Sequence, residues 1–259
     1  MIREAVLTRR QAQGDMSDLP NQALIEELRD QLRLRSNPAK APGMQRYMKS
    51  AMPYLGVTSP ELSTVCRAVF PHHTLDSADS FRATVLELWR TASYREERYA
   101  AIAITGDKRY ANYQTPELVP VYEELIITGA WWDYVDSVAT HRVGPLLASY
   151  REPMSSLLRH WSRDPDMWKR RTAIIAQVSL KHDLDFDLLS FAIEPNLDDR
   201  EFFIRKAIGW ALREDAKRYP ERVERFVSEH AFRLSGLSRR EAVKGIGYGH
   251  LRNTAKRQQ

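Results

Sequence analysis

Apolar side chains recur at intervals of three and four residues from about residue 20 onward, the spacing of one face of an α-helix. Helix starts are marked where a short polar residue precedes Pro and an acid, since Pro fits the first turn and the polar side chain caps it. Such starts occur at 59–61 (SPE), 115–117 (TPE) and 164–166 (DPD). No segment alternates convincingly between apolar and polar residues, as a strand would. The pattern predicts an all-α chain.

Three of the helical segments resemble one another. Segment 167–176 (MWKRRTAIIA) aligns with 202–211 (FFIRKAIGWA) at an offset of 35 residues, as aromatic, then basic, then small and apolar residues. Segment 94–104 (YREERYAAIAI) repeats the theme roughly twice that distance upstream. A helical period of this length is typical of HEAT-type repeats, whose helix pairs bury their apolar faces only by stacking. We therefore expect a curved solenoid of stacked antiparallel helix pairs with a concave basic groove.

The two ends of the chain differ from the middle. Residues 1–20 are polar and predict a flexible extension, residues 21–250 a single helical repeat domain, and residues 251–259 a basic tail. From residue 239 onward a single acid, Glu241, accompanies six basic residues. These are Arg239, Arg240, Lys244, Arg252, Lys256 and Arg257. They form either a solvated tail or a set of phosphate contacts.

Composition adds moderate constraints. The 259 residues are 43% hydrophobic, which is ample for a buried core, and the net charge of +5 is only weak support for a polyanionic partner. No apolar run is long enough to span a bilayer, and the opening MIREAVLTRR lacks a signal-peptide core, so we expect a cytoplasmic protein. Cys66, the single cysteine, excludes an internal disulfide and is expected to be a small buried hydrophobe.

Several sites for metals and cofactors are excluded by their spacing. Asp183, Asp185 and Asp187 alternate, but the Gly and distal Glu of an EF-hand loop are missing, so a solvated helix start is expected. His72 and His73 lack a third ligand at helical spacing, and no zinc-type CxxC pair occurs. The phosphate-binding loop, the Rossmann glycine pattern and GxSxG are also missing. We expect no metal and no nucleotide cofactor.

The segment WWDYVDSVATHRVG, which begins at Trp131, places two tryptophans and two acids on one helix. At ~100° per residue, Trp131, Val135 and Val138 form one apolar stripe that belongs in the core. Trp132 and Asp136 share a different face. Either Trp132 packs half-exposed against the next repeat with a solvated Asp136, or the pair faces a ligand.

Arg171 lies close to the middle of the apolar arc of a helix expected over residues 167–180. A buried charge without a partner is very costly, so this guanidinium needs an anion. A carboxylate from a neighbouring repeat would satisfy it structurally. A phosphate or a catalytic Asp at the wall of a groove would satisfy it functionally, and the pattern leaves both open.

Trp210 shares a face with Phe203 and Ala207 on a helix expected near residues 201–213. In isolation this spacing favours a core tryptophan. Gly209 just before it leaves room for a flat group to approach.

Four segments together resemble the DNA alkylation repair glycosylases of the AlkD type, a family built from HEAT-like repeats. They are MQRYMKSAMPYLGV (44–57), WWDYVDSVATHRVG (131–144), MWKRRTAII (167–175) and FFIRKAIGWALRE (202–214). The resemblance extends over residues 25–250 and implies an Asp, an Arg and two Trp in a concave DNA-binding groove. These map to Asp136, Arg171, Trp132 and Trp210, with Tyr47 as a further groove aromatic.

The resemblance implies a hydrolase that cleaves the N-glycosidic bond of cationic alkylated purines in duplex DNA, such as N7-methylguanine or N3-methyladenine. A cationic base leaves without a general acid, and Asp136 would stabilise the oxocarbenium-like sugar and orient water. A monomer is expected, associated with the nucleoid when bound to DNA. The residues expected to contact DNA, besides Tyr47, are basic: Arg170, Arg205, Lys206, Arg239, Arg240 and Lys244.

Two alternatives belong to other classes. The first is a non-catalytic HEAT-repeat protein that binds damaged or branched DNA, which the presence of both Asp136 and Arg171 disfavours. The second is a HEAT scaffold for protein partners, in which the basic tail and the buried arginine would be incidental.

Overall fold

The computed structural model of the chain describes residues 19–257. Within this range every regular element is helical, and no described residue lies in a strand. The predicted all-α fold is therefore confirmed. The chain forms two compact units, residues 1–113 and 114–259. The expected extension of residues 1–20 lies outside the described residues except for its last two positions.

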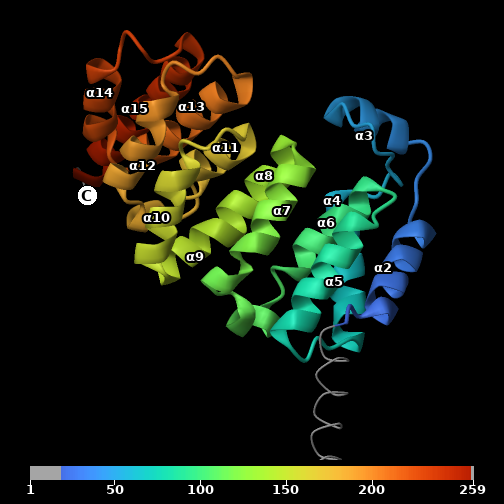
Figure 1. The fold of residues 1–259 in the computed structure, drawn as a ribbon. Helices are drawn as coiled ribbons and strands as arrows, with labels where there is room; N and C mark the ends of the chain where they lie inside the picture. Colours follow the sequence, from blue (N-terminus) through green and yellow to red (C-terminus); the bar gives the residue numbers. More distant parts are fainter. Residues whose placement is uncertain (1–18, 258–259) are drawn as a thin grey trace, which may run out of the picture. The chain divides into compact units, whose positions relative to one another are not determined.

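The first unit contains five α-helices and two 3₁₀ segments among its described residues (Figure 1). They are α2 (Gln22–Leu34), α3 (Ala41–Met48), α4 (Ser59–Val69), η1 (Phe70–His72), α5 (Ala78–Arg90), α6 (Arg95–Ile104) and η2 (Lys108–Tyr113). Helix α2 packs on α4, α5 and α6, so the four share one core. Phe81 and Trp89 of α5 are fully buried in it.

Local chemistry explains where these helices begin. Thr58 and Glu61 form a reciprocal capping box at the start of α4, and Ser77 caps α5 by accepting from the backbone N–H of Ser80. The prediction for Cys66 is confirmed: its side chain is buried in α4, and burial raises the pKa of the thiol to about 12.

The second unit continues the helical pattern in its described residues (Figure 1). It comprises η3 (Pro116–Leu118), α7 (Val119–Gly129), α8 (Trp132–Val138), the π-helical turn η4 (Ala139–Val143), α9 (Gly144–Ser149), α10 (Arg151–Trp161), α11 (Met167–Ile175), η5 (Lys181–Asp183), α12 (Phe186–Ile193), η6 (Glu194–Asn196), α13 (Phe202–Ala216), α14 (Pro220–Glu229) and α15 (Gly236–Arg257). Trp161, Tyr122 and Tyr134 are its largest fully buried side chains.

Four helices of this unit pack in succession: α8 on α11, α11 on α13, and α13 on α15. Asp136, Arg171, Lys206 and Glu241, one on each helix, follow one another at the 35-residue offset seen in the sequence. The predicted helical repeat is thus confirmed in this unit. A single domain over residues 21–250 and a concave groove stay predictions.

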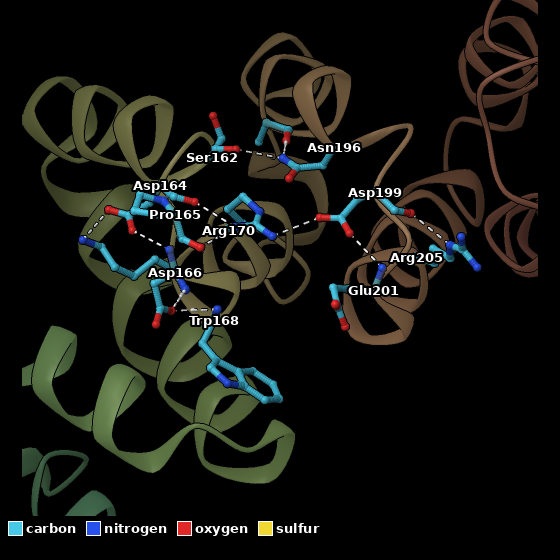
Figure 2. A network of polar contacts seen from close by, with 12 residues as sticks. Ser162, Asp164, Pro165, Asp166, Trp168, Arg170, Asn196, Asp199, Glu201 and Arg205 are labelled. Atoms are coloured by element: carbon cyan, nitrogen blue, oxygen red, sulfur yellow. Dashed lines mark hydrogen bonds and ion pairs between the residues drawn. The ribbon is translucent and has the colours of Figure 1, made fainter.

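The starts of α11 and α13 show how closely the repeat is built. Before α11, the Asp164 carboxylate accepts from the backbone N–H of Asp166 at 2.9 Å, and Arg170 donates back to the Asp164 carbonyl at 2.8 Å. Figure 2 shows these contacts around the loop that leads into α11. The arginine therefore fixes the turn from which its own helix starts.

The same arrangement recurs before α13, 35 residues later. Asp199 accepts from the backbone N–H of Glu201 at 2.8 Å, and Arg205 donates back to the Asp199 carbonyl at 2.9 Å (Figure 2). Arg170 also reaches across to the Asp199 carboxylate at 3.0 Å. These polar contacts tie the start of one inner helix to the start of the next.

Some helix boundaries differ from the sequence prediction. Helix α11 begins at Met167 with Asp166 as its N-cap and ends at Ile175, shorter than the expected 167–180. Asp185 caps α12, which confirms a helix start at the three alternating acids. Helix α15 runs to Arg257, so residues 251–257 of the expected tail are helical, and 258–259 lie outside the described residues. No helix in the described chain is long and apolar enough to cross a membrane.

Candidate active site

Helix α8 begins one residue later than its hydrophobic pattern suggests. Trp131 has an extended backbone (φ −151°, ψ 145°) and is the N-cap, so it does not continue the stripe of Val135 and Val138, which are fully buried. The prediction that Trp131 belongs to this stripe is wrong. Its ring is half-buried and packs against Trp168 and Phe203, with centroids 6.4 and 5.4 Å away. Trp132 therefore opens the helix and shares a face with Asp136.

Asp136 and Arg171 form a two-point ion pair between α8 and α11. Arg171 Nε donates to Oδ1 and Nη2 to Oδ2, each at 2.7 Å. The remaining nitrogen, Nη1, donates to the backbone carbonyl of Phe203 in the first turn of α13. A guanidinium matches a carboxylate in this fork geometry, which restricts both groups to one orientation. Arg171 thus connects three successive helices of the repeat.

The two partners of this pair differ in exposure. The Arg171 side chain is only 4% exposed, while the Asp136 side chain keeps 18%. Burial raises the pKa of the Asp136 carboxyl above its ordinary value, against the hydrogen bonds from Arg171, which lower it. Both oxygens accept from a group that only donates, so the geometry is that of an ionised carboxylate. One face of a fixed anion is left open.

That open face borders a cavity of about 250 Å³. Its lining comes from three helices of the repeat: Trp132, Asp136, Arg171, Phe202, Phe203, Lys206, Trp210 and Arg213. Two half-exposed indoles, a carboxylate and several cations thus surround one space. Such a site can hold an apolar or cationic flat group against the rings while presenting it to a negative charge.

Comparison with known proteins identifies the family. A family model described as DNA alkylation repair enzyme matches residues 28–246. The chain belongs to the DNA alkylation repair enzyme family. A solved structure, "Predicted DNA alkylation repair enzyme from Enterococcus faecalis", is similar over 81% of this chain and 95% of that one, with 28% identity and a TM-score of 0.73. None of the curated proteins compared matches.

Membership of this family gives the chain a role in DNA repair and confirms the resemblance drawn from its four segments. The residues mapped by that resemblance, Trp132, Asp136, Arg171 and Trp210, line one cavity. The sequence left open whether Arg171 pairs with a structural carboxylate or with a functional group. Its partner is Asp136, which is both a carboxylate from a neighbouring repeat and the candidate catalytic residue.

Trp210 and Gly209 do not have the surroundings that their spacing suggested. Trp210 is half-exposed at the cavity, not buried in the core. The room beside Gly209 is taken by α15, because a Cβ there would lie 2.7 Å from Cβ of Glu241 and 3.1 Å from Cα of Ser238. The missing side chain lets α13 and α15 pack closely.

Three residues that line the cavity were not predicted as site residues from the sequence: Phe202, Phe203 and Arg213. By its spacing, Phe203 lies on the same helical face as Trp210. Arg213 follows Lys206 by seven residues, which is two helical turns. The pattern therefore contained a signal for both, although nothing in it separated them from ordinary surface positions. Phe202 is exposed and contacts the ring of Phe203 edge-on.

The residues expected to contact DNA fall into different settings. Arg170 and Arg205 hold the loops before α11 and α13 (Figure 2). Arg239 and Arg240 are exposed in the first turns of α15. Tyr47, exposed on α3, belongs to the first unit. DNA contact by any of them stays a prediction.

Lys206 and Lys244 share a different setting, since each donates to the buried carboxylate of Glu241 at 3.1 Å. No cluster of three or more His, Cys, Asp or Glu side chains suited to a metal ion occurs among the described residues.

Proposed function

We propose that the chain is a DNA glycosylase that hydrolyses the N-glycosidic bond of cationic alkylated purines in duplex DNA. The observation that carries this proposal is a fixed carboxylate, Asp136, that faces a cavity lined by Trp132 and Trp210. The family's role in DNA alkylation repair supports it independently. N7-methylguanine and N3-methyladenine are the lesions whose chemistry fits this site.

The leaving group explains why one carboxylate suffices. An N7- or N3-alkylated purine already carries a positive charge, so it departs as a neutral base and needs no proton from the protein. Positive charge instead develops on the sugar as the bond breaks. A unit charge at ~4 Å with an effective dielectric constant of ~20 contributes about 4 kcal/mol. If this attraction acts mainly in the transition state, it accelerates the reaction about 10³-fold.

Asp136 has the capacity for a second task. Each carboxylate oxygen accepts one hydrogen bond from Arg171 and keeps a further acceptor position. A water molecule held there would be oriented for attack on the sugar carbon. Arg171 then acts by fixing the carboxylate and not by holding a phosphate, because its side chain is almost fully buried and engaged at all three nitrogens.

The two tryptophans supply binding for the cationic substrate. The faces of their rings carry negative electrostatic potential, which attracts a methylated purine or a sugar cation by about 0.5–2 kcal/mol per contact. Phosphate contacts by Lys206, Lys244, Arg239 and Arg240, with Arg170, Arg205 and Tyr47, would hold the duplex, and the protein would act as a cytoplasmic monomer at the nucleoid.

A base-release assay tests this function. A duplex with a single N7-methylguanine is incubated with the protein, and alkaline cleavage at the abasic site is followed on a gel. We expect release from this duplex and none from a matched duplex with O6-methylguanine, which is alkylated but neutral. Binding without release would contradict the proposal and favour the non-catalytic alternative.

A further inference from the structure

A carboxylate outside the cavity organises the cations at its rim. Glu241, on α15, has a side chain that is only 6% exposed, and three basic side chains converge on it. Lys206 and Lys244 donate to Oε1 at 3.1 Å each, and Arg213 donates to Oε2. Arg213 and Lys206 come from the same face of α13, two turns apart. One buried anion thus gathers three cations from two helices.

Two of these cations reach the cavity itself. Lys206 and Arg213 both line it, together with Asp136 and Arg171, while their own side chains keep 40% and 31% exposure. Each therefore retains donors that face solvent. Three cations share the Glu241 carboxylate. Arg213 also lies 3.5 Å from Glu214, whose charge Lys217 balances at 2.6 Å, so Glu241 and its three cations keep a net charge of +2. Because the pair of Asp136 and Arg171 is neutral in sum, the positive field at the rim comes from the Glu241 cluster.

The repeat places Glu241 at a defined position. Arg171 on α11 and Lys206 on α13 are equivalent at the 35-residue offset, and each is held by a carboxylate. For Arg171 that carboxylate is Asp136, one period before it; for Lys206 it is Glu241, one period after it. Gly209 admits the Glu241 side chain close to α13, since a Cβ at position 209 would lie only 2.7 Å from Cβ of Glu241. The close packing therefore brings Glu241 within reach of Lys206 and Arg213.

Glu241 stays ionised in this setting. Burial alone would raise its pKa, but the hydrogen bonds from Lys206 and Lys244 outweigh that effect and lower the pKa below the ordinary value. A neighbouring carboxylate, Glu214, lies 3.5 Å from Arg213 but is engaged more closely by Lys217 at 2.6 Å. The cluster is therefore organised by Glu241 and not by Glu214.

We propose that Glu241 is a positioning residue that holds Lys206 and Arg213 as a two-cation site for one backbone phosphate of DNA beside the cavity. Without the Glu241 carboxylate, Lys206 and Arg213 would repel each other and move apart. This inference rests on the proposed function, because it assumes that the cavity receives DNA. It adds Arg213 to the expected phosphate contacts and assigns a role to the single acid of the basic C-terminal region.

The direction in which one substitution changes DNA affinity distinguishes a positioning role of Glu241 from a purely electrostatic one. Glu241→Gln removes a negative charge close to the expected DNA path, so a purely electrostatic role predicts tighter binding. A positioning role predicts weaker binding in spite of the more positive protein. We expect about tenfold weaker affinity, the size of one charge-assisted contact. The slope of log affinity against log salt should fall in magnitude by about 0.9, the value for one lost phosphate contact.

The experiment measures fluorescence anisotropy of an unmodified duplex across a salt series. Glu229→Gln is the matched control, since Glu229 is exposed on α14, undergoes the same charge change and does not line the cavity. Affinity equal to or tighter than that of this control, with an unchanged salt slope, would overturn the positioning role while DNA binding stands. A wild-type protein that does not bind duplex DNA would overturn the proposed function, and this inference with it.

A second set of variants tests the proposal even if the Glu241→Gln protein does not fold. Lys206→Gln with Arg213→Gln changes two partly exposed side chains and leaves Glu241 with Lys244. We expect this double variant to lose the same salt slope, and Glu241→Gln added to it to cause no further loss. A further loss on the triple variant would show that Glu241 acts by another route. Circular dichroism of each variant confirms its fold.

Discussion

Each of the two units of the molecule holds a carboxylate that is largely shielded from solvent, and the two sites differ in the partners and surroundings of that group. In the first unit, Glu96 is fully buried and accepts three backbone N–H bonds from Leu55, Gly56 and Val57 at 2.9–3.1 Å. In the second, Asp136 is held by one guanidinium and faces a cavity. Burial raises the pKa of both acids.

A buried acid with a raised pKa is therefore not by itself a sign of a functional site. The oxygens of Glu96 hold the turn at Gly56, whose backbone lies in the left-handed region at φ 85°, and no cavity reaches them among those described. Asp136 is held by a single guanidinium, that of Arg171, and aromatic rings lie beside it in the cavity. Glu96 supports a local fold, whereas Asp136 lines a cavity, where we propose that it acts on a ligand.

The largest expected effect concerns these two acids directly. Asp136→Asn should lower base release about 10³-fold, because the neutral amide no longer attracts the developing sugar cation. Glu96→Gln should leave the release rate per folded molecule unchanged. Both rates are measured on the N7-methylguanine duplex, with folded protein quantified by circular dichroism. Equal losses of release rate in the two variants would contradict a catalytic role that belongs to Asp136 and not to Glu96.

A smaller loss is expected when the support of Asp136 is altered. Arg171→Gln should reduce release about 100-fold, the size expected when a catalytic group is displaced by about 1 Å. Arg171→Lys keeps the charge but not the fork, so its loss should be nearly as large. The measurement is the release rate at saturating protein, with duplex affinity determined in parallel. A large loss of affinity with an unchanged saturated rate would instead assign Arg171 to phosphate binding.

The Glu96 carboxylate is expected to matter for the stability of the first unit. Glu96→Gln removes a charged acceptor from three backbone donors and should lower the free energy of unfolding by about 2–3 kcal/mol. The control is Glu26→Gln, an exposed change on α2 of the same unit, for which less than about 0.5 kcal/mol is expected. Urea denaturation measures both. A Glu96→Gln protein as stable as the control would mean that the backbone turn does not depend on the carboxylate.

The smallest effect is a shift in pH dependence. Because burial raises the pKa of Asp136, its carboxylate is protonated at a higher pH than an ordinary aspartate, and release should fall as pH drops through that raised value. Glu241, whose pKa is lowered, stays ionised to lower pH, so DNA binding through its cation cluster should outlast release. The measurement is saturated release and affinity across pH. Release that falls only together with affinity would contradict this separation.

Much of the fold and the core of the site followed from the sequence, for physical reasons. The spacing of apolar residues reports helices because a helix must bury one face, and the 35-residue offset reports stacked repeats. The angular separation of Trp132 and Asp136 from Val135 and Val138 held, since it depends only on helix geometry. The resemblance of four segments then identified which of the unusual residues belong together.

Other features depend on contacts between distant segments and had no local signal. Trp131 leaves the helix as its N-cap because its ring packs against Trp168 and Phe203, which lie 37 and 72 positions away in the chain. The sequence around Gly209 did not indicate that α15 fills the space beside this glycine. Glu241 counted in the sequence only as one acid in a basic region, and its role depends on which helix packs beside it.

The most direct test of the proposed role of Asp136 is the single-turnover rate of N7-methylguanine release by the wild-type, Asp136→Asn and Asp133→Asn proteins on one duplex. Asp133 is the matched control, since it carries the same change on the same helix and does not line the cavity. We expect a rate about 10³-fold lower for Asp136→Asn, with affinity retained, and a change of less than about threefold for Asp133→Asn. Undiminished release by Asp136→Asn would contradict this role.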